Sequence, residues 1–294
     1  MNGDTLKWGF LSTARINQAL IEPLRLSERN SLAAVASRSQ EKADAYAKEW
    51  GVPLSYGSYE QLLADPQIDV VYISLPNHLH AEWSIKAAKA GKHVLCEKPL
   101  ALSLEEVDAI EAAINASGTV LAEAFMYRHH PQMNLLSQLI KDGKIGKLQM
   151  ILGTFSFYLD RPGDIRLDPE MGGGSIWDVG CYPISFARTI ASSEPEQVFG
   201  WQVSSDSGVD LIFNGQMRFP GDVFAQFDSS FRSPFRTHAE IVGTDGVIYI
   251  ANPFKPDHDE VVIIHTSAGV EEISVPDQSL YIGEVEDISD AVLD

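Results

Sequence analysis

The chain has 294 residues, enough for about two domains with substantial hydrophobic cores. Hydrophobic residues make up 45% and charged residues 21%, which is typical of a globular protein and excludes collagen-like, disordered and coiled-coil classes. The net charge is −19, of which −17 lies in residues 151–294. Because such a chain repels nucleic-acid phosphates and anionic membranes, we expect neither as a partner.

The sequence predicts no membrane span, signal peptide, disulfide scaffold or cysteine metal site. No apolar run approaches the roughly 18 residues of a membrane span, and the first residues do not form a signal peptide. The two cysteines, Cys96 and Cys181, are too few for a disulfide scaffold and have no metal-site spacing. We therefore expect a cytoplasmic protein without a metal.

Short β-branched runs alternate with helical patterns over the first 120 residues. The expected strands are Lys7 to Leu11, Ser31 to Ser37, Val70 to Leu75, His93 to Cys96 and Thr119 to Leu121, with helices near 15–22, 39–50, 59–65, 79–90 and 103–117. The nearly continuous apolar run Val70 to Leu75 indicates a parallel strand covered on both faces. This series predicts an α/β domain of the Rossmann type, with a doubly wound parallel sheet.

After residue 148 the runs become longer and mostly alternate apolar with polar residues. They are Gln149 to Tyr158, Gln197 to Ser204, Val209 to Phe219, Asp222 to Phe231, His238 to Val242, Val247 to Ala251, Val261 to His265 and Val270 to Val275. Such alternation predicts an α+β domain with a large, mostly antiparallel open sheet. The boundary falls between Ala122 and Pro131, which gives domains 1–122 and 123–294.

The first strand-to-helix turn is where a dinucleotide pyrophosphate would meet a helix N-terminus. This turn reads Ser12-Thr13-Ala14-Arg15-Ile16-Asn17 and lacks the usual glycines. Ser12 and Ala14 are small enough for close approach of the backbone, and the hydroxyls of Ser12 and Thr13 can donate to phosphate. The residues alone leave two interpretations open, a cofactor site and an ordinary tight turn.

The end of the second expected strand reads Ser37-Arg38-Ser39. An NAD site normally has a carboxylate there for the ribose hydroxyl, and this chain has none. A guanidinium and hydroxyls suit a 2′-phosphate, so NADP is favoured over NAD if a dinucleotide binds. The alternative is a solvated arginine at the end of a strand.

Two further loops lie where ligands bind in parallel sheets, beyond the carboxyl ends of the strands. In Pro76-Asn77-His78-Leu79-His80, the alternative to ligand binding is that Asn77 or His78 caps the next helix. In Glu97-Lys98-Pro99, a lysine at the edge of a low-dielectric cleft suits proton chemistry beside a hydride transfer. The alternative for Lys98 is a surface lysine.

The segment Gly172 to Pro183 predicts a flexible glycine loop running into a helix. Ser175 would be the N-cap, and Asp178 three residues later completes a capping box, which is the alternative to a chemical role for Asp178. Asp178 and Tyr182 are four apart and would share a helix face. Pro183 favours a kink or a new helical start near Gly180.

Together these segments resemble the Gfo/Idh/MocA oxidoreductases. The resemblance rests on Ser12 to Ile16, Glu97-Lys98-Pro99, Ala124 to Pro131 and Gly172 to Tyr182, and it extends over residues 6 to 290. The branch with the greatest similarity is that of NADP-dependent aldose (D-xylose) dehydrogenases and dimeric dihydrodiol dehydrogenases. The resemblance implies a nicotinamide cofactor in a Rossmann domain and a C-terminal domain whose open sheet forms oligomer contacts.

The resemblance also assigns roles by position. Lys98, whose peptide bond to Pro99 is often cis in relatives, would be the catalytic lysine, Tyr182 the acid/base and Asp178 the residue that orients the substrate hydroxyl. Arg128 and His130 would line the substrate side, unless His130-Pro131 only begins a helix. The residues expected to bind the cofactor are Ser12, Thr13, Ala14, Arg15, Ile16, Ser37, Arg38, Leu75, Asn77, His80, Glu97 and Lys98.

The function that follows is hydride transfer between NADP and a sugar or polyol, aldose 1-dehydrogenase-like, by a homo-oligomer. Two alternatives remain, an NAD-dependent glycoside hydrolase without net redox and a non-catalytic regulator that senses dinucleotide or sugar. We expect the loops after Tyr158 and around Asp164 to Glu170 to set substrate choice. The chain stops at Asp294, early in an expected helix from Glu284, where family members usually continue.

Overall fold

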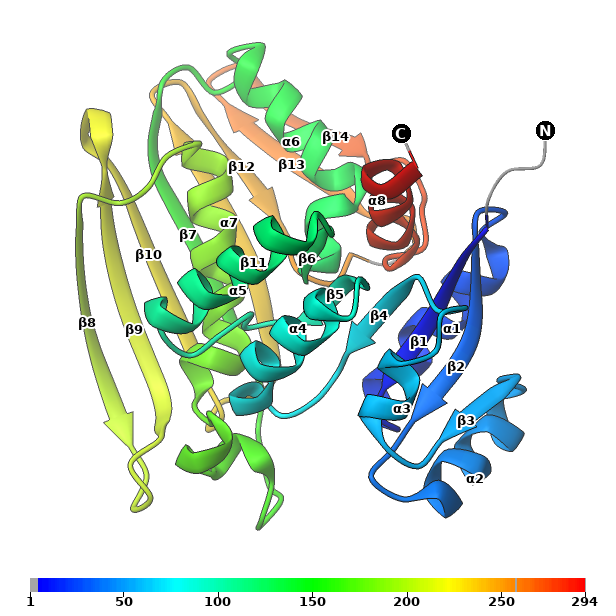
Figure 1. Ribbon diagram of the computed structural model, residues 1–294. Helices are drawn as coiled ribbons and strands as arrows, with labels where there is room; N and C mark the ends of the chain where they lie inside the picture. The colour runs from blue at the N-terminus through cyan, green and yellow to red at the C-terminus, as the bar shows by residue number, and fades with distance from the viewer. Residues whose placement is uncertain (1–4, 257, 294) are drawn as a thin grey trace. The chain divides into compact units, whose positions relative to one another are not determined.

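The computed structural model describes residues 5–256 and 258–293, which fold into two compact units (Figure 1). Unit 1 comprises Met1–Met126 with Tyr281–Asp294, and unit 2 comprises Tyr127–Leu280. The sequence pattern placed the last residues with the second domain, whereas α8 (Ile282–Leu293) packs against α1 (Gln18–Leu26) of unit 1. Arg29 fixes this helix through ion pairs to Glu286 at 2.6 Å and Asp290 at 2.7 Å.

Unit 1 contains a six-stranded parallel sheet in the order β3-β2-β1-β4-β5-β6, the order of a dinucleotide-binding Rossmann fold. The strands are β1 (Leu6–Leu11), β2 (Asn30–Ala36), β3 (Leu54–Tyr56), β4 (Val70–Ile73), β5 (His93–Glu97) and β6 (Leu121–Ala124). The predicted doubly wound sheet is confirmed. The three-residue strand β3 was not predicted, and β6 begins two residues later than expected.

Helices cover both faces of this sheet because successive strand residues point to opposite sides. Trp8, Phe10 and Tyr72 pack with α1, α2 and α8, while Val71 and Val94 pack with α3 and α4. The remaining helices of unit 1 are α2 (Gln40–Trp50), α3 (Tyr59–Leu63), α4 (His80–Lys89) and α5 (Leu104–Ser117), with short helical turns η1 (Arg15–Asn17), η2 (Asn77–Leu79) and the start of η3 (Met126–His129).

Unit 2 contains an eight-stranded sheet in the order β14-β13-β12-β11-β7-β10-β9-β8, which confirms the predicted large, mostly antiparallel sheet. All neighbouring strands are antiparallel except the parallel pair β7 and β10. The strands are β7 (Leu148–Ser156), β8 (Gln197–Ser204), β9 (Asp210–Phe219), β10 (Val223–Ser230), β11 (Arg236–Gly243), β12 (Gly246–Ile250), β13 (Val261–Thr266) and β14 (Gly269–Ser274), and the longer helices are α6 (Pro131–Lys141) and α7 (Cys181–Ala191).

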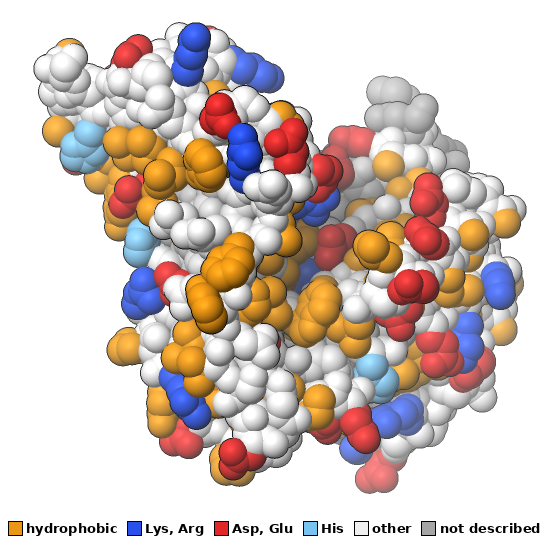
Figure 2. Space-filling view, turned by 90° about the vertical axis from the view of Figure 1, so that its left-hand side faces the viewer, with side chains coloured by type: hydrophobic (Ala, Val, Ile, Leu, Met, Phe, Trp, Pro, Cys, Tyr) orange, Lys and Arg blue, Asp and Glu red, His pale blue; other side chains and the backbone are white. Residues whose placement is uncertain are grey.

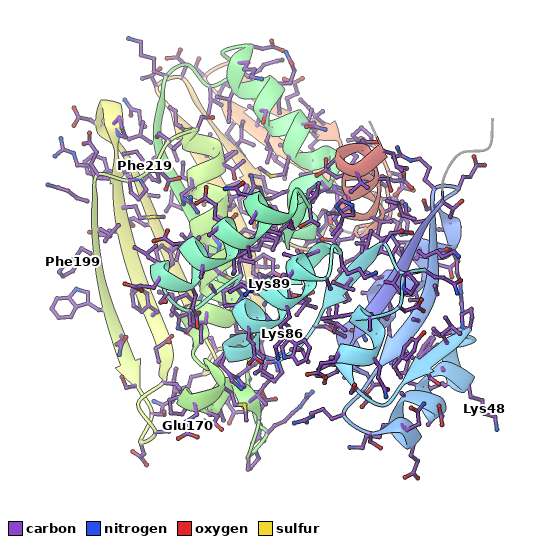
Figure 3. All side chains as sticks on the ribbon, in the orientation of Figure 1. Lys48, Lys86, Lys89, Glu170, Phe199 and Phe219 are labelled. Atoms are coloured by element: carbon purple, nitrogen blue, oxygen red, sulfur yellow. The ribbon has the colours of Figure 1, made fainter. Side chains whose placement is uncertain are left out.

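The two faces of this sheet differ. On one face, α7 lies so close to β7 that a Cβ at Gly153 would come within 2.9 Å of Pro183. The opposite face, which we call the open face, carries Phe199, Trp201 and Phe224, which are 57%, 71% and 45% exposed. Figure 2 views the side of unit 2 formed by β8, β9 and β10, and Figure 3 shows Phe199 projecting away from the sheet. Within the described part of the chain, no helix is both long and apolar enough to cross a membrane.

Candidate active site

The turn after β1 is held by polar side chains where glycines would be expected. Ser12 has φ of 149°, a value that favours glycine. Its Oγ lies 2.7 Å from Ser74 Oγ and accepts from the Ala14 N–H at 3.0 Å. Asn17 joins both residues, because its Nδ2 donates to the Ser12 carbonyl at 2.8 Å and its Oδ1 accepts from Ser74 Oγ at 2.5 Å. The network fixes this turn without the three glycines.

This turn is compatible with a dinucleotide phosphate. The side chain of Ser12 is buried against Ser74, so it does not obstruct the outside of the turn. Thr13 and Ala14 there are small and half-buried, and Arg15 is exposed. A close approach of the phosphate to the backbone is therefore sterically open at the place where the Rossmann fold binds it.

The end of β2 carries a cation. Ser37 is buried and Arg38 is exposed. Burial raises the pKa of Tyr59, and a hydrogen bond from the Arg38 side chain opposes that shift. Ser39 is the N-cap of α2 and accepts from the Lys42 N–H at 3.4 Å. Arg38 thus directly precedes the N-cap of α2 in the chain, and a cation and a helix N-terminus both favour an anionic group.

The loops after β4 and β5 bring further predicted residues to the same edge of the sheet. Glu97 and Lys98 are half-buried, and the Lys98–Pro99 peptide bond is cis. The Tyr72 hydroxyl donates to Glu97 Oε1. Leu75 is buried, and Asn77 begins η2.

Helix capping does not explain Asn77 or His78. The N-cap positions of η2 and α4 are Pro76 and Leu79, and neither helix has a side-chain cap. The capping alternative for this loop was therefore wrong.

In unit 2, the segment before α7 begins as a π-helical turn, Ile176–Gly180, and α7 follows from Cys181. Ser175 makes no capping bond, so the predicted capping box is wrong. The Asp210 carboxylate at the start of β9 accepts instead from the Ile176 N–H at 2.9 Å and from Ser175 Oγ at 2.5 Å. Asp210 was not foreseen, because nothing in its local sequence shows that it reaches this turn.

The glycines before this turn serve close packing rather than the expected flexibility. A Cβ at Gly174, whose φ is +131°, would lie 2.4 Å from Asp210 Oδ1. A Cβ at Gly173 would lie 2.6 Å from the Arg166 carbonyl. Larger residues would displace the backbone that carries Asp178.

Asp178 is held by an arginine. Arg166 Nε donates to Asp178 Oδ2 at 2.8 Å, and Arg166 Nη1 donates to Asp164 Oδ1 at 3.2 Å. Burial lowers the pKa of the Arg166 guanidinium, but the two carboxylates outweigh burial and the pKa is raised. The pair therefore stays charged and fixes the Asp178 carboxylate. Arg166 lies in the loop that the sequence associated with substrate choice, but its own role was missed.

Tyr182 lies in the first turn of α7 and is 5% exposed. Its ring contacts those of Phe155, Phe254 and Tyr127 at centroid distances of 5.3, 5.7 and 6.0 Å. This aromatic cluster fixes the ring of Tyr182 by packing. Asp178 and Tyr182 thus come from consecutive turns of one helical segment, as their spacing predicted.

The other two residues expected on the substrate side differ in exposure. Arg128 is exposed at the end of η3. His130 is 1% exposed and is the N-cap of α6, where its Nδ1 accepts from the Gln132 N–H at 3.3 Å. His130-Pro131 therefore begins a helix, as the alternative predicted. Within residues 5–256 and 258–293, no group of three or more His, Cys, Asp or Glu side chains could hold a metal ion.

Comparisons with known proteins agree with this fold. A family model described as "Oxidoreductase family, NAD-binding Rossmann fold" matches residues 6–125, and the GFO/IDH/MocA C-terminal domain matches residues 133–249. The chain belongs to the Gfo/Idh/MocA oxidoreductase family. Its unit 1 is an NAD(P)-binding Rossmann domain, and its relatives are oxidoreductases, several of which have a sugar substrate in their names.

Two curated relatives and one solved structure illustrate this similarity. D-xylose 1-dehydrogenase (NADP(+)) 2 from Haloferax volcanii is 41% identical over 84% of this chain and 76% of its own. Trans-1,2-dihydrobenzene-1,2-diol dehydrogenase from Danio rerio is 33% identical over 83% of this chain and 74% of its own. A 3-ketoreductase from Actinomadura kijaniata, solved with NADP and TDP-benzene, has a TM-score of 0.92 at 27% identity and covers 99% of this chain and 90% of its own.

Proposed function

We propose that this oxidoreductase transfers a hydride between NADP and a sugar or related hydroxyl compound. The observation that carries the proposal is the Asp178 carboxylate, fixed by Arg166 one helical turn before the packed phenol of Tyr182. A carboxylate and a phenol on one helical segment suit the orientation and deprotonation of an alcohol. The names of the relatives, a D-xylose dehydrogenase and a dihydrodiol dehydrogenase, support the same class of substrate.

The preference for NADP rests on the end of β2. Arg38 and the hydroxyls of Ser37 and Ser39 offer donors to a 2′-phosphate, and no carboxylate competes for the ribose. The proposed phosphate contacts of the turn after β1 come from Thr13, Ala14, Arg15 and Ile16, with Ser12 holding the turn. The H. volcanii relative carries NADP(+) in its name, which supports this choice.

The proposed roles of the side chains follow from their chemistry. Bound NADP would supply the acceptor for the hydride. Asp178 accepts a hydrogen bond from a substrate hydroxyl and orients it, while Tyr182 takes the proton of the reacting hydroxyl. Lys98 is proposed as the catalytic lysine that the family resemblance implies. We place Arg128 at the substrate and keep Leu75, Asn77 and Glu97 at the cofactor.

The test is absorbance of NADPH with the purified protein, NADP⁺ or NAD⁺, and a panel of D-xylose, D-glucose, other aldoses, polyols and a trans-dihydrodiol. Stoichiometric reduction with a preference for NADP⁺ is expected. Tight dinucleotide binding without reduction of any cofactor would contradict the proposal and favour the regulator. Cleavage of a glycoside without accumulation of reduced cofactor would favour the hydrolase.

We also propose that the protein is a cytoplasmic homo-oligomer. Neither Cys96 nor Cys181 forms a disulfide with another described residue, which fits a reducing compartment. Every residue of β8 is exposed, and the open face presents Phe199, Trp201 and Phe224 to solvent. Contiguous exposed aromatic side chains of this kind mark protein interfaces, so we assign the open face to contact with a second copy.

A further inference from the structure

His80, the first residue of α4, is completely buried at the ligand edge of unit 1. Its Nδ1 lies 2.7 Å from the carbonyl oxygen of Pro99, and its Nε2 lies 2.8 Å from the carbonyl oxygen of Leu75. One imidazole ring therefore joins the segment after β4 to the loop that carries Lys98. Its close neighbour His78 makes no corresponding contact with these two carbonyls.

The chemistry of these contacts fixes the protonation state. A carbonyl oxygen only accepts hydrogen bonds, whereas a neutral imidazole has one N–H and one bare nitrogen. A neutral His80 would direct a lone pair at a carbonyl oxygen less than 3 Å away, at one end or the other. Only the imidazolium, which donates from both nitrogens, satisfies both contacts.

Two other histidines show the opposite pattern. His93 Nδ1 accepts from the Val120 N–H at 3.0 Å, and His130 Nδ1 accepts from the Gln132 N–H at 3.3 Å. A nitrogen that accepts a hydrogen bond carries no proton, so both rings are neutral.

The groups around His80 shift its pKa in both directions. Burial is the largest effect and leaves the pKa of His80 lowered overall, with the Lys98 ammonium acting in the same direction, while the two carbonyl oxygens and the Glu97 carboxylate oppose the shift. On the helix packed against α4, the Glu106 carboxylate accepts from the Leu102 N–H at 2.8 Å and is thereby engaged locally. The geometry of the two short contacts is the ground for assigning the charge against that direction, because losing a proton would turn one of them into a repulsion between lone pairs.

We propose that His80 is a buried imidazolium that ties the end of β4 to the loop carrying Lys98, and that it is a positioning residue for that lysine. The carbonyl that it holds belongs to Pro99, the residue next to Lys98. The expected effect of His80 on turnover rests on the proposed function, whereas the charge of its ring does not. His80 then acts on the cofactor site through this loop.

The charge is tested by NMR of the full chain labelled with ¹⁵N-histidine at pH 7. We expect both ring nitrogens of His80 to be protonated, and His93 and His130 to have one bare nitrogen each. The signals are assigned by their loss in His80→Gln or, if that variant does not fold, by elimination with glutamine variants at the other histidines. A neutral His80 ring at pH 7 would overturn the proposal.

The positioning role is tested by the pH dependence of kcat. His80→Gln keeps a donor for only one carbonyl, so we expect kcat to fall about 10- to 100-fold, with a smaller change in KM for NADP⁺. Turnover of the wild type should decline as pH rises through the His80 pKa, and the variant should lack that step. His93→Gln, at the other end of β5, is the control and should keep the wild-type profile.

Identical profile shapes for the wild type and His80→Gln would contradict the positioning role. A protein that reduces no cofactor would contradict the proposed function instead, and the NMR result would still decide the charge of His80.

Discussion

Arg166 joins Asp178 to Asp164, with Nε 2.8 Å from Asp178 Oδ2 and Nη1 3.2 Å from Asp164 Oδ1. The arginine lies in the short helical turn η4 (Ile165–Leu167) within the loop after β7, and Asp178 comes from the helical segment that also carries Tyr182. On the proposed function, this loop acts on substrate binding through the carboxylate that it orients, and substitutions in the loop need not touch the substrate to change its affinity.

Removing the Arg166 guanidinium is expected to lower the activity on a sugar substrate more than the stability of the fold. Arg166→Gln loses charge-assisted hydrogen bonds of about 1.5–3 kcal/mol, so kcat/KM for the sugar should fall roughly 10- to 100-fold with KM raised. The matched control is Arg188→Gln, whose exposed partner Glu194 lies 2.6 Å away. Steady-state kinetics that show equal, small effects for both variants would contradict the role of Arg166.

The hydroxyl of Tyr182 is expected to matter for chemistry and little for stability. Tyr182→Phe keeps the ring contacts with Phe155 and Phe254 but has no proton to exchange, so kcat should fall at least about 100-fold while Tm changes little. Tyr127→Phe is the control, because the Tyr127 hydroxyl donates to Ser185 Oγ at 2.9 Å. Full turnover by Tyr182→Phe would exclude it as the acid/base.

Arg38 is expected to decide between the two dinucleotides. In Arg38→Ala, KM for NADP⁺ should rise about 10- to 100-fold while KM for NAD⁺ changes little, because only NADP carries the 2′-phosphate. The control is Arg25→Ala, an exposed arginine of unit 1 that donates to the Trp50 carbonyl. If Arg38→Ala raised both KM values equally, the end of β2 would not be the discriminating contact.

Glu284 is expected to destabilise the fold as pH rises. It is 1% exposed, and neither carboxylate oxygen has a hydrogen-bond partner among the residues that the structure describes. Burial, together with the Glu97 charge, raises its pKa well above the usual value. The folded state therefore holds this proton more tightly than the unfolded state, and the resulting stability, present below the unfolded pKa, is lost as pH rises. Glu284→Gln removes that titration.

Chemical denaturation at several pH values tests this expectation. Glu284→Gln should gain about 1–3 kcal/mol in free energy of unfolding at pH 8 and little at pH 4. Glu286→Gln, on the same helix, should lose stability at neutral pH instead, because it weakens the ion pair with Arg29. A gain of the same size at both pH values would show that Glu284 does not titrate in this way.

The strands could be predicted because periodicity is local. The apolar run at Val70 to Leu75 and the alternation in the second half contain their own evidence for buried and half-buried strands. No local pattern predicts that α8 packs against unit 1, because its contacts with Arg29 and Asn30 join residues more than 250 positions apart. The same distance explains why residues 281–293 were assigned to the second domain.

The candidate site residues could be predicted from the sequence only where they belong to a recognisable motif. Lys98, Asp178 and Tyr182 belong to segments that resemble a family, but Arg166 and Asp210 act through contacts that only the folded chain makes. Capping rules consider residues within one turn, so they gave Asp178 a role that Asp210 performs from β9. His80 was grouped with the cofactor, whereas its ring contacts are with two protein carbonyls.

The open face is expected to mediate self-association. Phe199 and Trp201 pack edge to face at 5.3 Å and remain more than half exposed, so covering them would bury apolar area without reorganising the strand. Light scattering after size-exclusion chromatography should give a dimer or larger species for the wild type, and Trp201→Glu should shift it toward the monomer. Val198→Glu is the control, because Val198 is 72% exposed on the opposite face of β8. A monomeric wild type, or an unchanged mass for Trp201→Glu, would contradict this interface.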